Sequence, residues 1–329
     1  MDCIIEGNSI RPFCAAIACL SRVGKEINFD FDPIDGLTLR SLNDSKSIFA
    51  SFHYEPSFFQ KCCIPQVAGR KRRKSQGLSE ETEDDERWSV RVSMKALAPL
   101  IRPRKDVLSL QIVTVGDLLS FEFQLQRASG IVVKIIYRVG YSLAHSVAAI
   151  ASTEGSSELV VQPQVLLTML EPLRRATEIA LLVNETHKLI SGVTFAHDDI
   201  AQEASSNLTK PTSLKTETSI GYDELIDLEY MHPDESHEDG PNPPPADLNE
   251  QVVLVFTLKE FKAMLQYCAQ AADQSLPVSI SFFWGGKPMV VKTNVEGFSG
   301  ELVMATLDHK LMASMKTSST SGPRPTGMS

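Results

Sequence analysis

The sequence predicts an α+β fold built from two similar halves, and three observations carry this prediction. The chain has 329 residues, more than one hydrophobic core usually needs and a suitable length for two domains. Several short stretches alternate between apolar and polar residues with the period of a half-buried antiparallel strand. The order of helices and strands in the first half also recurs in the second.

The strand pattern is clearest in four stretches that are rich in β-branched and aromatic residues: 27–31, 48–53, 119–125 and 278–282. Helices are predicted at 10–23, 93–101, 164–171 and 257–270. Near the start of each half an apolar helical stretch leads into a pair of strands, and later in each half a strand leads into a helix. The two halves therefore share one plan.

The composition is that of an ordinary globular protein, but its charge is unevenly distributed. The net charge is −9, and residues 197–250 alone contribute −12, so the rest of the chain carries +3. No apolar run approaches the roughly 20 residues of a membrane helix, so we expect a soluble, intracellular protein with no membrane partner. The six cysteines show no C-x-x-C pair, which predicts free, mostly buried thiols.

Three segments have compositions that are typical of flexible chain. Residues 64–87 contain a basic cluster followed by an acidic run, residues 231–248 are acidic and then proline-rich, and the tail 309–329 is rich in Ser, Thr, Gly and Pro. The basic cluster consists of Arg70, Lys71, Arg72, Arg73 and Lys74. Its acidic neighbours would oppose phosphate, so we interpret it as a nuclear-import signal and expect a nuclear protein.

The first and last predicted helices each have one apolar and one basic face. In the first, Ile10, Phe13, Cys14, Ile17 and Leu20 form the apolar stripe, whereas Arg11, Ala15, Ala18 and Arg22 share another face that Lys25 extends. In the last, Leu258, Phe261, Leu265 and Cys268 form the apolar stripe, and Lys259 and Lys262 lie on the other side with Gln266 and Gln270. Thr257 and Glu260 have the spacing of a capping box, which predicts the start of this helix.

The two middle helices carry basic residues as well. Lys95 lies on the second helix, which runs into Arg102, Arg104 and Lys105, and Pro172 should end the third helix, leaving Arg174 and Arg175 at its exit. Any one of these side chains can be an ordinary solvated residue. Basic faces on four helices of an otherwise acidic chain nevertheless predict one surface that contacts phosphate, as in non-sequence-specific binding to double-stranded DNA.

The sequence offers no catalytic motif, and we predict no catalytic residue, no metal site and no cofactor. The Gly-rich, nucleophile-elbow and H-E-x-x-H motifs are missing from it. His232 and His237 stand among acidic residues in a proline-bounded segment that lacks the rigid scaffold of a metal site. Asp84 and Asp85, as possible nuclease carboxylates, lie in an equally unstructured composition.

Several segments resemble the Rad-nine-type subunit of the heterotrimeric nine-one-one DNA-damage checkpoint clamp. They are residues 18–26, 35–47 and 58–60 in the first half, and 256–261 and 300–307 in the second. The resemblance implies the DNA sliding-clamp (processivity-factor) fold, in which each of two domains has an antiparallel sheet outside and two helices inside. It also implies a ring of three different subunits that a clamp loader closes around DNA, where it acts in checkpoint signalling and DNA repair.

The resemblance further implies how the chain is divided. Clamp domain 1 would span residues 1–139, the connector 140–158 and clamp domain 2 residues 159–308. The outer strands at the subunit interfaces would be 131–137, with Ile131, Val133, Ile135 and Tyr137, and 214–218, with Leu214, Thr216 and Thr218. In sliding clamps the connector receives repair enzymes and other partners, which here points to Ala144, Val147 and Ile150. Relatives also recruit a checkpoint adaptor through a long tail, whereas this tail has only about 20 residues.

Two alternatives remain open at this point. One is a homotrimeric replication clamp like proliferating cell nuclear antigen (PCNA), which has the same fold but associates with itself. The other is a 3′ exonuclease, an activity sometimes attributed to the family, for which the sequence supplies no metal ligands.

Overall fold

A computed structural model describes residues 1–63, 88–102, 106–145, 148–149, 151–195, 216–231 and 251–307. Within these residues a β-α-β-β-β unit occurs four times along the chain. The first half contains β1 (Asp2–Glu6), α1 (Ile10–Val23), β2 (Glu26–Asp32), β3 (Gly36–Leu42) and β4 (Ile48–Tyr54), then β6 (Trp88–Ser93), α2 (Met94–Leu97), β7 (Val107–Val115), β8 (Leu118–Gln126) and β9 (Val132–Gly140). The prediction of two similar α+β halves is therefore confirmed.

The second half repeats this order. It contains β11 (Ser157–Val161), α3 (Pro163–Met169), β12 (Glu178–Asn184), β13 (Leu189–Phe195) and β14 (Glu217–Gly221), then β16 (Gln251–Thr257), α5 (Leu258–Gln270), β17 (Val278–Phe282), β18 (Met289–Val295) and β19 (Phe298–Met304). The 3-10 turn η1 (Gly7–Ser9) precedes α1 within the first unit. Further short elements stand between the units: the 3-10 turns η2 (Pro56–Phe58) and η4 (Tyr222–Glu224), and the strands β5 (Lys61–Cys63), β10 (Ser142–Leu143) and β15 (Asp227–Glu229).

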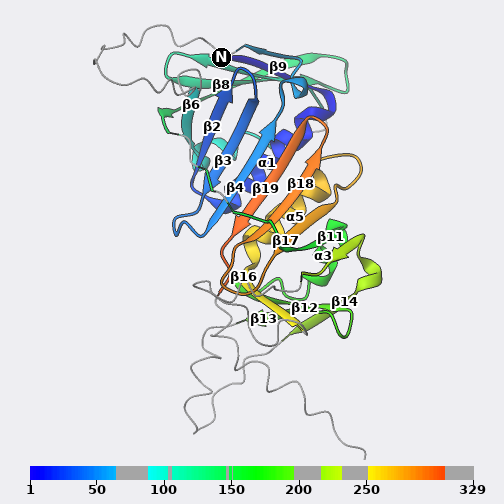
Figure 1. Cartoon of the computed structure of the whole chain (residues 1–329). Helices are drawn as coiled ribbons and strands as arrows, with labels where there is room; N and C mark the ends of the chain where they lie inside the picture. The colour runs from blue at the N-terminus through cyan, green and yellow to red at the C-terminus, as the bar shows by residue number, and fades with distance from the viewer. Residues whose placement is uncertain are drawn as a thin grey trace, which may run out of the picture.

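The described strands form three antiparallel sheets, and the largest is shared by both halves (Figure 1). The central sheet has the order β10-β6-β2-β3-β4-β19-β18-β17-β11-β15, and β4 pairs with β19 along its whole length, from Ile48↔Met304 to Tyr54↔Phe298. A sheet of order β5-β1-β7-β8-β9 lies at one end of the molecule, and a sheet of order β14-β13-β12-β16 lies at the other.

Helices α1 and α5 cover one face of the central sheet. The ring of Phe13 on α1 packs against Tyr54 with centroids 5.7 Å apart, and Tyr267 on α5 packs against Phe52 at 4.4 Å. Helix α5 also packs against α1 and α3. The apolar stripes of α1 and α5 are buried against the sheet as the sequence predicts, and they fill one large core with the inward residues of the strands.

Two of the predicted helices are shorter than expected, and proline explains both differences. Helix α2 ends at Leu97 and continues only as a turn, because Pro99 has no N–H to donate to the carbonyl of Lys95. Helix α3 ends at Met169, two residues early, because a residue that precedes proline, here Glu171, disfavours the helical conformation. Helix α1 spans 10–23 as predicted.

The capping box predicted for α5 is wrong in its hydrogen bonds. Thr257 is the N-cap residue with extended backbone, but its side chain makes no cap bond, and its buried hydroxyl has no partner. Instead, the Leu258 amide donates to the carbonyl of Thr177 on the neighbouring chain segment, at 3.0 Å. The Met94 amide makes the equivalent 2.8 Å bond to Lys25 at the start of α2, so the repeat extends to the helix starts.

The expectation of free thiols holds for only part of the cysteines. Cys14, Cys19 and Cys268 are buried thiols, as predicted, whereas the thiol of Cys63 is exposed. Cys3 and Cys62, by contrast, form a disulfide. These two cysteines occupy directly opposed positions of β1 and β5, with their Cα atoms 4.1 Å apart, a proximity that sequence spacing cannot reveal.

Candidate DNA-facing surface and subunit edges

The basic face of α1 points away from the central sheet. Arg11, Ala18 and Arg22 are exposed, whereas Ala15 between them is buried. Arg22 lies in the last turn of α1, where a cation interacts favourably with the helix dipole. Arg11, in the first turn, forms an ion pair with Asp273 at 3.2 Å, although both side chains are largely solvated.

The basic face of α5 is partly neutralised by a carboxylate that follows α3. The Lys262 ammonium lies 3.2 Å from the Glu171 carboxylate, and the Arg174 guanidinium binds the same carboxylate at 2.8 Å. The hydrogen bonds from Arg174 and then Lys262 hold the pKa of Glu171 below its usual range. Lys259 is exposed and lies 3.5 Å from Glu260 of its own helix.

The predicted DNA-facing residues differ in whether a carboxylate pairs with them. Arg22, Lys95, Arg102 and Arg175 are exposed and have no ion-pair partner among the residues that the structure describes. Lys25 is exposed but binds the Asp44 carboxylate, which raises the pKa of Lys25. Arg104 and Lys105 lie outside the described residues.

The sequence analysis missed the carboxylates that face these cations. Glu171 precedes Arg174 by three residues, a spacing that can signal a local ion pair. No local pattern could reveal the pair of Arg11 and Asp273, because 262 residues separate them. Among the described residues the candidate surface is consequently less positive than its lysines and arginines suggest, because carboxylates pair with Arg11, Lys25, Arg174 and Lys262.

Strand β9 is an open edge at one extreme of the molecule (Figure 1). The predicted outer strand was 131–137, and the observed strand is Val132–Gly140, so Ile131 precedes it and is 62% exposed. Val133, Ile135 and Tyr137 lie on the strand at half-buried positions, and Tyr137 packs on Phe123 with ring centroids 6.0 Å apart. The alternate residues, including Ile136, are exposed.

Strand β14 is an open edge at the opposite extreme of the molecule. The predicted strand was 214–218, and the observed one is Glu217–Gly221, with Leu214 outside the described residues. Thr216 still extends the pairing, because its N–H donates to Thr194 Oγ1 and its carbonyl accepts from the Thr194 amide. Thr218 donates its hydroxyl proton to the carbonyl of Met169 at 2.8 Å. An edge strand with unpaired main-chain groups can pair with another chain.

The predicted connector starts in the end sheet and then joins an edge of the central sheet. Gly140 belongs to β9, and β10 pairs with β6 before the half-buried Ala144 donates its amide proton to the Ser89 carbonyl at 3.2 Å. Val147 and Ile150 lie outside the described residues, as do Arg70, Lys71, Arg72, Arg73 and Lys74.

An apolar row crosses the sheet on the face opposite α1 and α5, and the sequence analysis did not find it. Leu42 pairs with Phe49, Phe49 with Val303, and Val303 with Val290, so these four side chains share one face. That face is the outer one, because the neighbouring Phe52 points toward α5. Phe49 and Val290 are buried, at 5% and 1% exposure.

The described residues show neither a metal cluster nor a membrane span. No group of three or more metal-ligating side chains comes together in them, and His232 and His237 lie outside them. The longest helix there, α1 with 14 residues, falls short of what a bilayer span needs.

Comparison with known proteins agrees with this architecture. The profile of the Rad9 family matches residues 13–307. A solved structure of PCNA from Thermococcus kodakaraensis is similar, with a TM-score of 0.62 and 12% identity over 93% of this chain and 99% of that one. The PCNA2–PCNA3 complex from Sulfolobus tokodaii has a TM-score of 0.62 and 11% identity over 93% of this chain and 99% of that one. PCNA from Entamoeba histolytica has a TM-score of 0.61 and 12% identity over 93% of this chain and 98% of that one.

These structural matches confirm the sliding-clamp fold that the sequence predicts, with antiparallel sheets and few helices. The family match covers nearly the whole of the described chain and includes every helix discussed above except the first residues of α1. The chain belongs to the Rad9 family.

Proposed function

We propose that this chain is one of three different subunits of a ring-shaped checkpoint clamp around double-stranded DNA. The observation that carries the proposal is the pair of open edge strands at opposite extremes of a sliding-clamp fold, β9 and β14. Two unlike edges on one chain make a heterologous, head-to-tail contact, and such contacts close into a ring when the rotation between subunits allows it.

The lengths of the two edges favour unlike neighbours over self-association. Strand β9 has nine residues, whereas β14 has five and Thr216 adds one more, so the described part of this edge in a second copy would leave about a third of β9 without a partner. Unpaired main-chain groups at an interface are costly. A homotrimeric clamp, the alternative, would have to tolerate this mismatch at all three interfaces.

The exposed cations of the helix layer would contact phosphate inside the ring. Arg22, Lys95, Arg102 and Arg175 supply charge without the fixed geometry that base recognition requires. Weak contacts of this kind allow sliding, and the closed ring provides the long residence on DNA. The function is accordingly that of a platform for repair enzymes and a checkpoint adaptor, loaded at damaged sites by an ATP-driven clamp loader, and not that of a nuclease.

Partners would dock beside the connector on the outer face. Of the apolar row on that face, the half-buried Leu42 and Val303 are accessible, whereas Phe49 and Val290 are buried beneath the surface, and the segment around Ala144 leaves the sheet from its β6 edge. We place the protein in the nucleus, with the cluster from Arg70 to Lys74 as the import signal.

Co-purification tests this proposal directly. The tagged chain is co-expressed with the two other clamp subunits of the same cell and, separately, alone, and both samples are analysed by sedimentation. We expect a 1:1:1 complex in the first case and a monomer in the second. A stable trimer of the chain alone would establish the homotrimeric replication clamp instead.

A further inference from the structure

A pocket lies at the end of the central sheet that is opposite the apolar row, and both halves of the chain build it. Its walls come from four segments: Asn8–Pro12 at the start of α1, Ser57 and Phe58 on η2, Ala271–Asp273 after α5, and Glu296–Phe298 at the turn between β18 and β19. Its volume is about 400 Å³. That volume falls within the range of ligand pockets, about 300–1,000 Å³.

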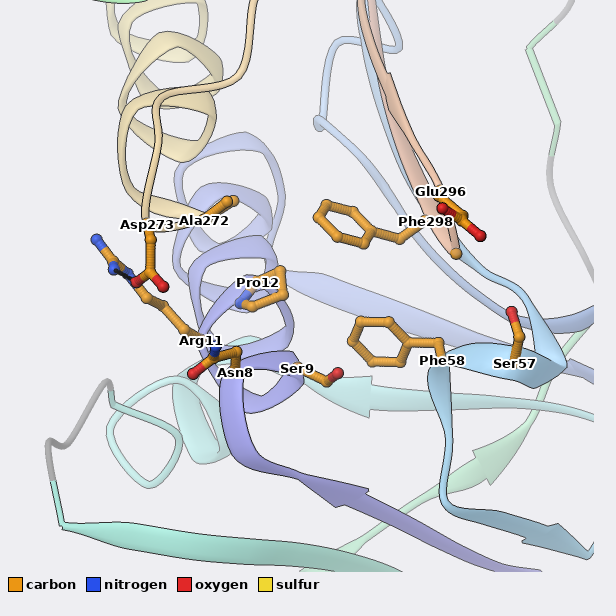
Figure 2. A pocket seen from close by; sticks show the side chains of 12 residues that line it. Asn8, Ser9, Arg11, Pro12, Ser57, Phe58, Ala272, Asp273, Glu296 and Phe298 are labelled. Carbon is orange, nitrogen blue, oxygen red and sulfur yellow. Dashed lines mark hydrogen bonds and ion pairs between the residues drawn. The ribbon is translucent and has the colours of Figure 1, made fainter.

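The centre of the pocket is aromatic. Figure 2 shows the rings of Phe58 and Phe298 pointing toward Pro12 and Ala272. The two rings meet edge to face with centroids 5.8 Å apart, and Tyr54 supports Phe58 from below the surface at 4.5 Å. Phe58 is 8% exposed, so this wall is fixed by packing before any ligand arrives.

The rim of the pocket is acidic. Asp273 is 80% exposed on one side, where it faces Arg11, and the exposed Glu296 lies on the other side beside Ser57 (Figure 2). The Ser57 hydroxyl donates to the exposed Glu55 carboxylate at 3.3 Å, which adds a third negative charge nearby. Arg11 is the single cation among the lining residues, and Asp273 already neutralises it.

We propose that this pocket docks a short peptide segment of a partner protein, in which a large apolar side chain is flanked by Lys or Arg. The apolar anchor would occupy the space between Phe58, Phe298 and Ala272, and the flanking cations would face Glu296 and Glu55, because Arg11 already pairs with Asp273. The carboxylate rim disfavours nucleic acid and anionic small molecules, and the aromatic walls offer no ligands for a metal ion.

This site is separate from the outer-face row proposed above for other partners. Phe298 begins β19 and Val303 lies five residues further along the strand, roughly 17 Å away at the rise of a β-strand. A peptide on the aromatic pocket and a partner on the row could therefore bind the same chain together. The inference does not require the ring, so it can be tested on the isolated full-length chain.

The test measures the binding of a fluorescein-labelled peptide, Gly-Ser-Lys-Phe-Leu-Lys-Ser-Gly, by fluorescence polarisation. One control peptide has Glu in place of both Lys, and another has Ser in place of Phe and Leu. The pocket is filled by Ala272→Trp or, from the opposite wall, by Ser57→Trp, and its rim is reversed by Glu296→Lys. Glu224→Lys, an exposed change on η4, is the matched control.

Filling the pocket should weaken binding about tenfold or more, because the anchor of a peptide carries most of its affinity. Glu296→Lys should cost roughly threefold, the size of one solvated charge contact, the Glu-substituted peptide roughly tenfold for two such contacts, and Glu224→Lys should cost nothing. Thermal melts show which variants fold. Because either Ala272→Trp or Ser57→Trp could fail to fold, both are made, and the one that folds gives the result. Equal binding of all three peptides, or full binding to both filled variants, would overturn the proposal. A competition experiment adds a second way to overturn the proposal. If a peptide of residues 308–329 displaces the labelled probe at a lower concentration than the unlabelled probe does, the occupant of the pocket is the chain's own tail.

Discussion

The Lys262 ammonium and the Glu171 carboxylate, 3.2 Å apart, connect helix α5 to the turn that follows α3. Glu171 also binds Arg174, so one carboxylate pairs with two of the residues that the sequence assigns to DNA and cancels one of their two charges. We predict that Glu171→Gln strengthens the retention of the assembled clamp on DNA, because it releases two cations toward phosphate. Retention is measured on nicked circular DNA across a salt series.

Acidification should strengthen the retention of the wild-type clamp on DNA, as Glu171→Gln does. The pKa of Glu171 is lowered in the folded chain, so its ion pairs are intact above the usual carboxyl range and are lost as the pH falls through the lowered value. The gain from Glu171→Gln should therefore shrink at low pH. Glu301→Gln, which removes the partner of Lys292 on the outer face, is the control and should change retention at no pH. A gain of equal size for both variants would place Glu171 away from DNA.

Removal of exposed cations should have the opposite effect. Arg22→Ala combined with Lys259→Ala should lower DNA retention at all sequences and reduce the slope of log affinity against log salt by about two, one for each lost phosphate contact. Lys292→Ala on the outer face should leave that slope unchanged. A double variant that prevents ring assembly while the retention of each assembled ring stays normal would mean that these side chains face another subunit.

Each edge strand should serve a different neighbour. Ile136→Asp places a charge on the exposed side of β9, and Glu217→Lys reverses a charge on β14. Each variant should lose one of the two other subunits in a pull-down and keep the second, because the two edges are at opposite extremes of the molecule. Loss of both subunits by either variant, with an unchanged melting temperature, would contradict this assignment.

Gly24 stands where a side chain has no room. A Cβ atom there would lie 2.4 Å from Ser41 Oγ and 2.5 Å from the carbonyl oxygen of Leu42. Gly24→Ala should therefore lower the free energy of unfolding by about 1–3 kcal/mol, the usual cost of overpacking. Gly140→Ala, with nothing within 4 Å of its Cβ, should stay within about 0.5 kcal/mol in the same urea titration. Equal stability of the two variants would contradict the prediction and would show that Ser41 and Leu42 on β3 can shift at little cost in free energy.

Nuclear import should depend on the basic cluster in residues 64–87. Replacement of Lys71, Arg72, Arg73 and Lys74 by Ala should reduce the nuclear fraction of a fluorescent fusion, since import signals are read as clustered positive charge. The melting temperature should not change. Lys287→Ala with Lys292→Ala provides a control for the loss of positive charge elsewhere, and an unchanged nuclear fraction in the cluster variant would refute the assignment.

Most helices and strands could be predicted from local sequence patterns, because the apolar pattern that defines an element lies within the element's own residues. The apolar stripe of α1 fixes both of its ends, and strict alternation gives β17 its observed bounds, Val278–Phe282. Strands β9 and β14 both end three residues later than predicted, because their main-chain pairing continues through Gly140 and Gly221, which the apolar alternation does not mark. Proline shortened α2 and α3, an effect that the sequence does contain and that the apolar pattern alone overlooks.

Long-range pairings could not be predicted in the same way. The pairing of β4 with β19, the disulfide of Cys3 and Cys62 and the ion pair of Arg11 and Asp273 all join residues that are distant in sequence. The pocket lined by Phe58 and Phe298 depends on the first of these pairings, because only the shared sheet brings the two rings together. The basic residues of the candidate surface were predictable, whereas the carboxylates that neutralise them were mostly not.

The pairing of β4 with β19 also sets the time at which the protein can fold. Phe298, the pairing partner of Tyr54, is synthesised about 240 residues later. At roughly 5–20 residues per second, this delay is on the order of 12–50 s. During this interval the edge of β4 has no neighbour from its own chain and is a template for aggregation. A ribosome-bound nascent chain of this protein should therefore depend on chaperones until its final strand emerges, and truncation before β19 should abolish solubility and not merely shorten the molecule.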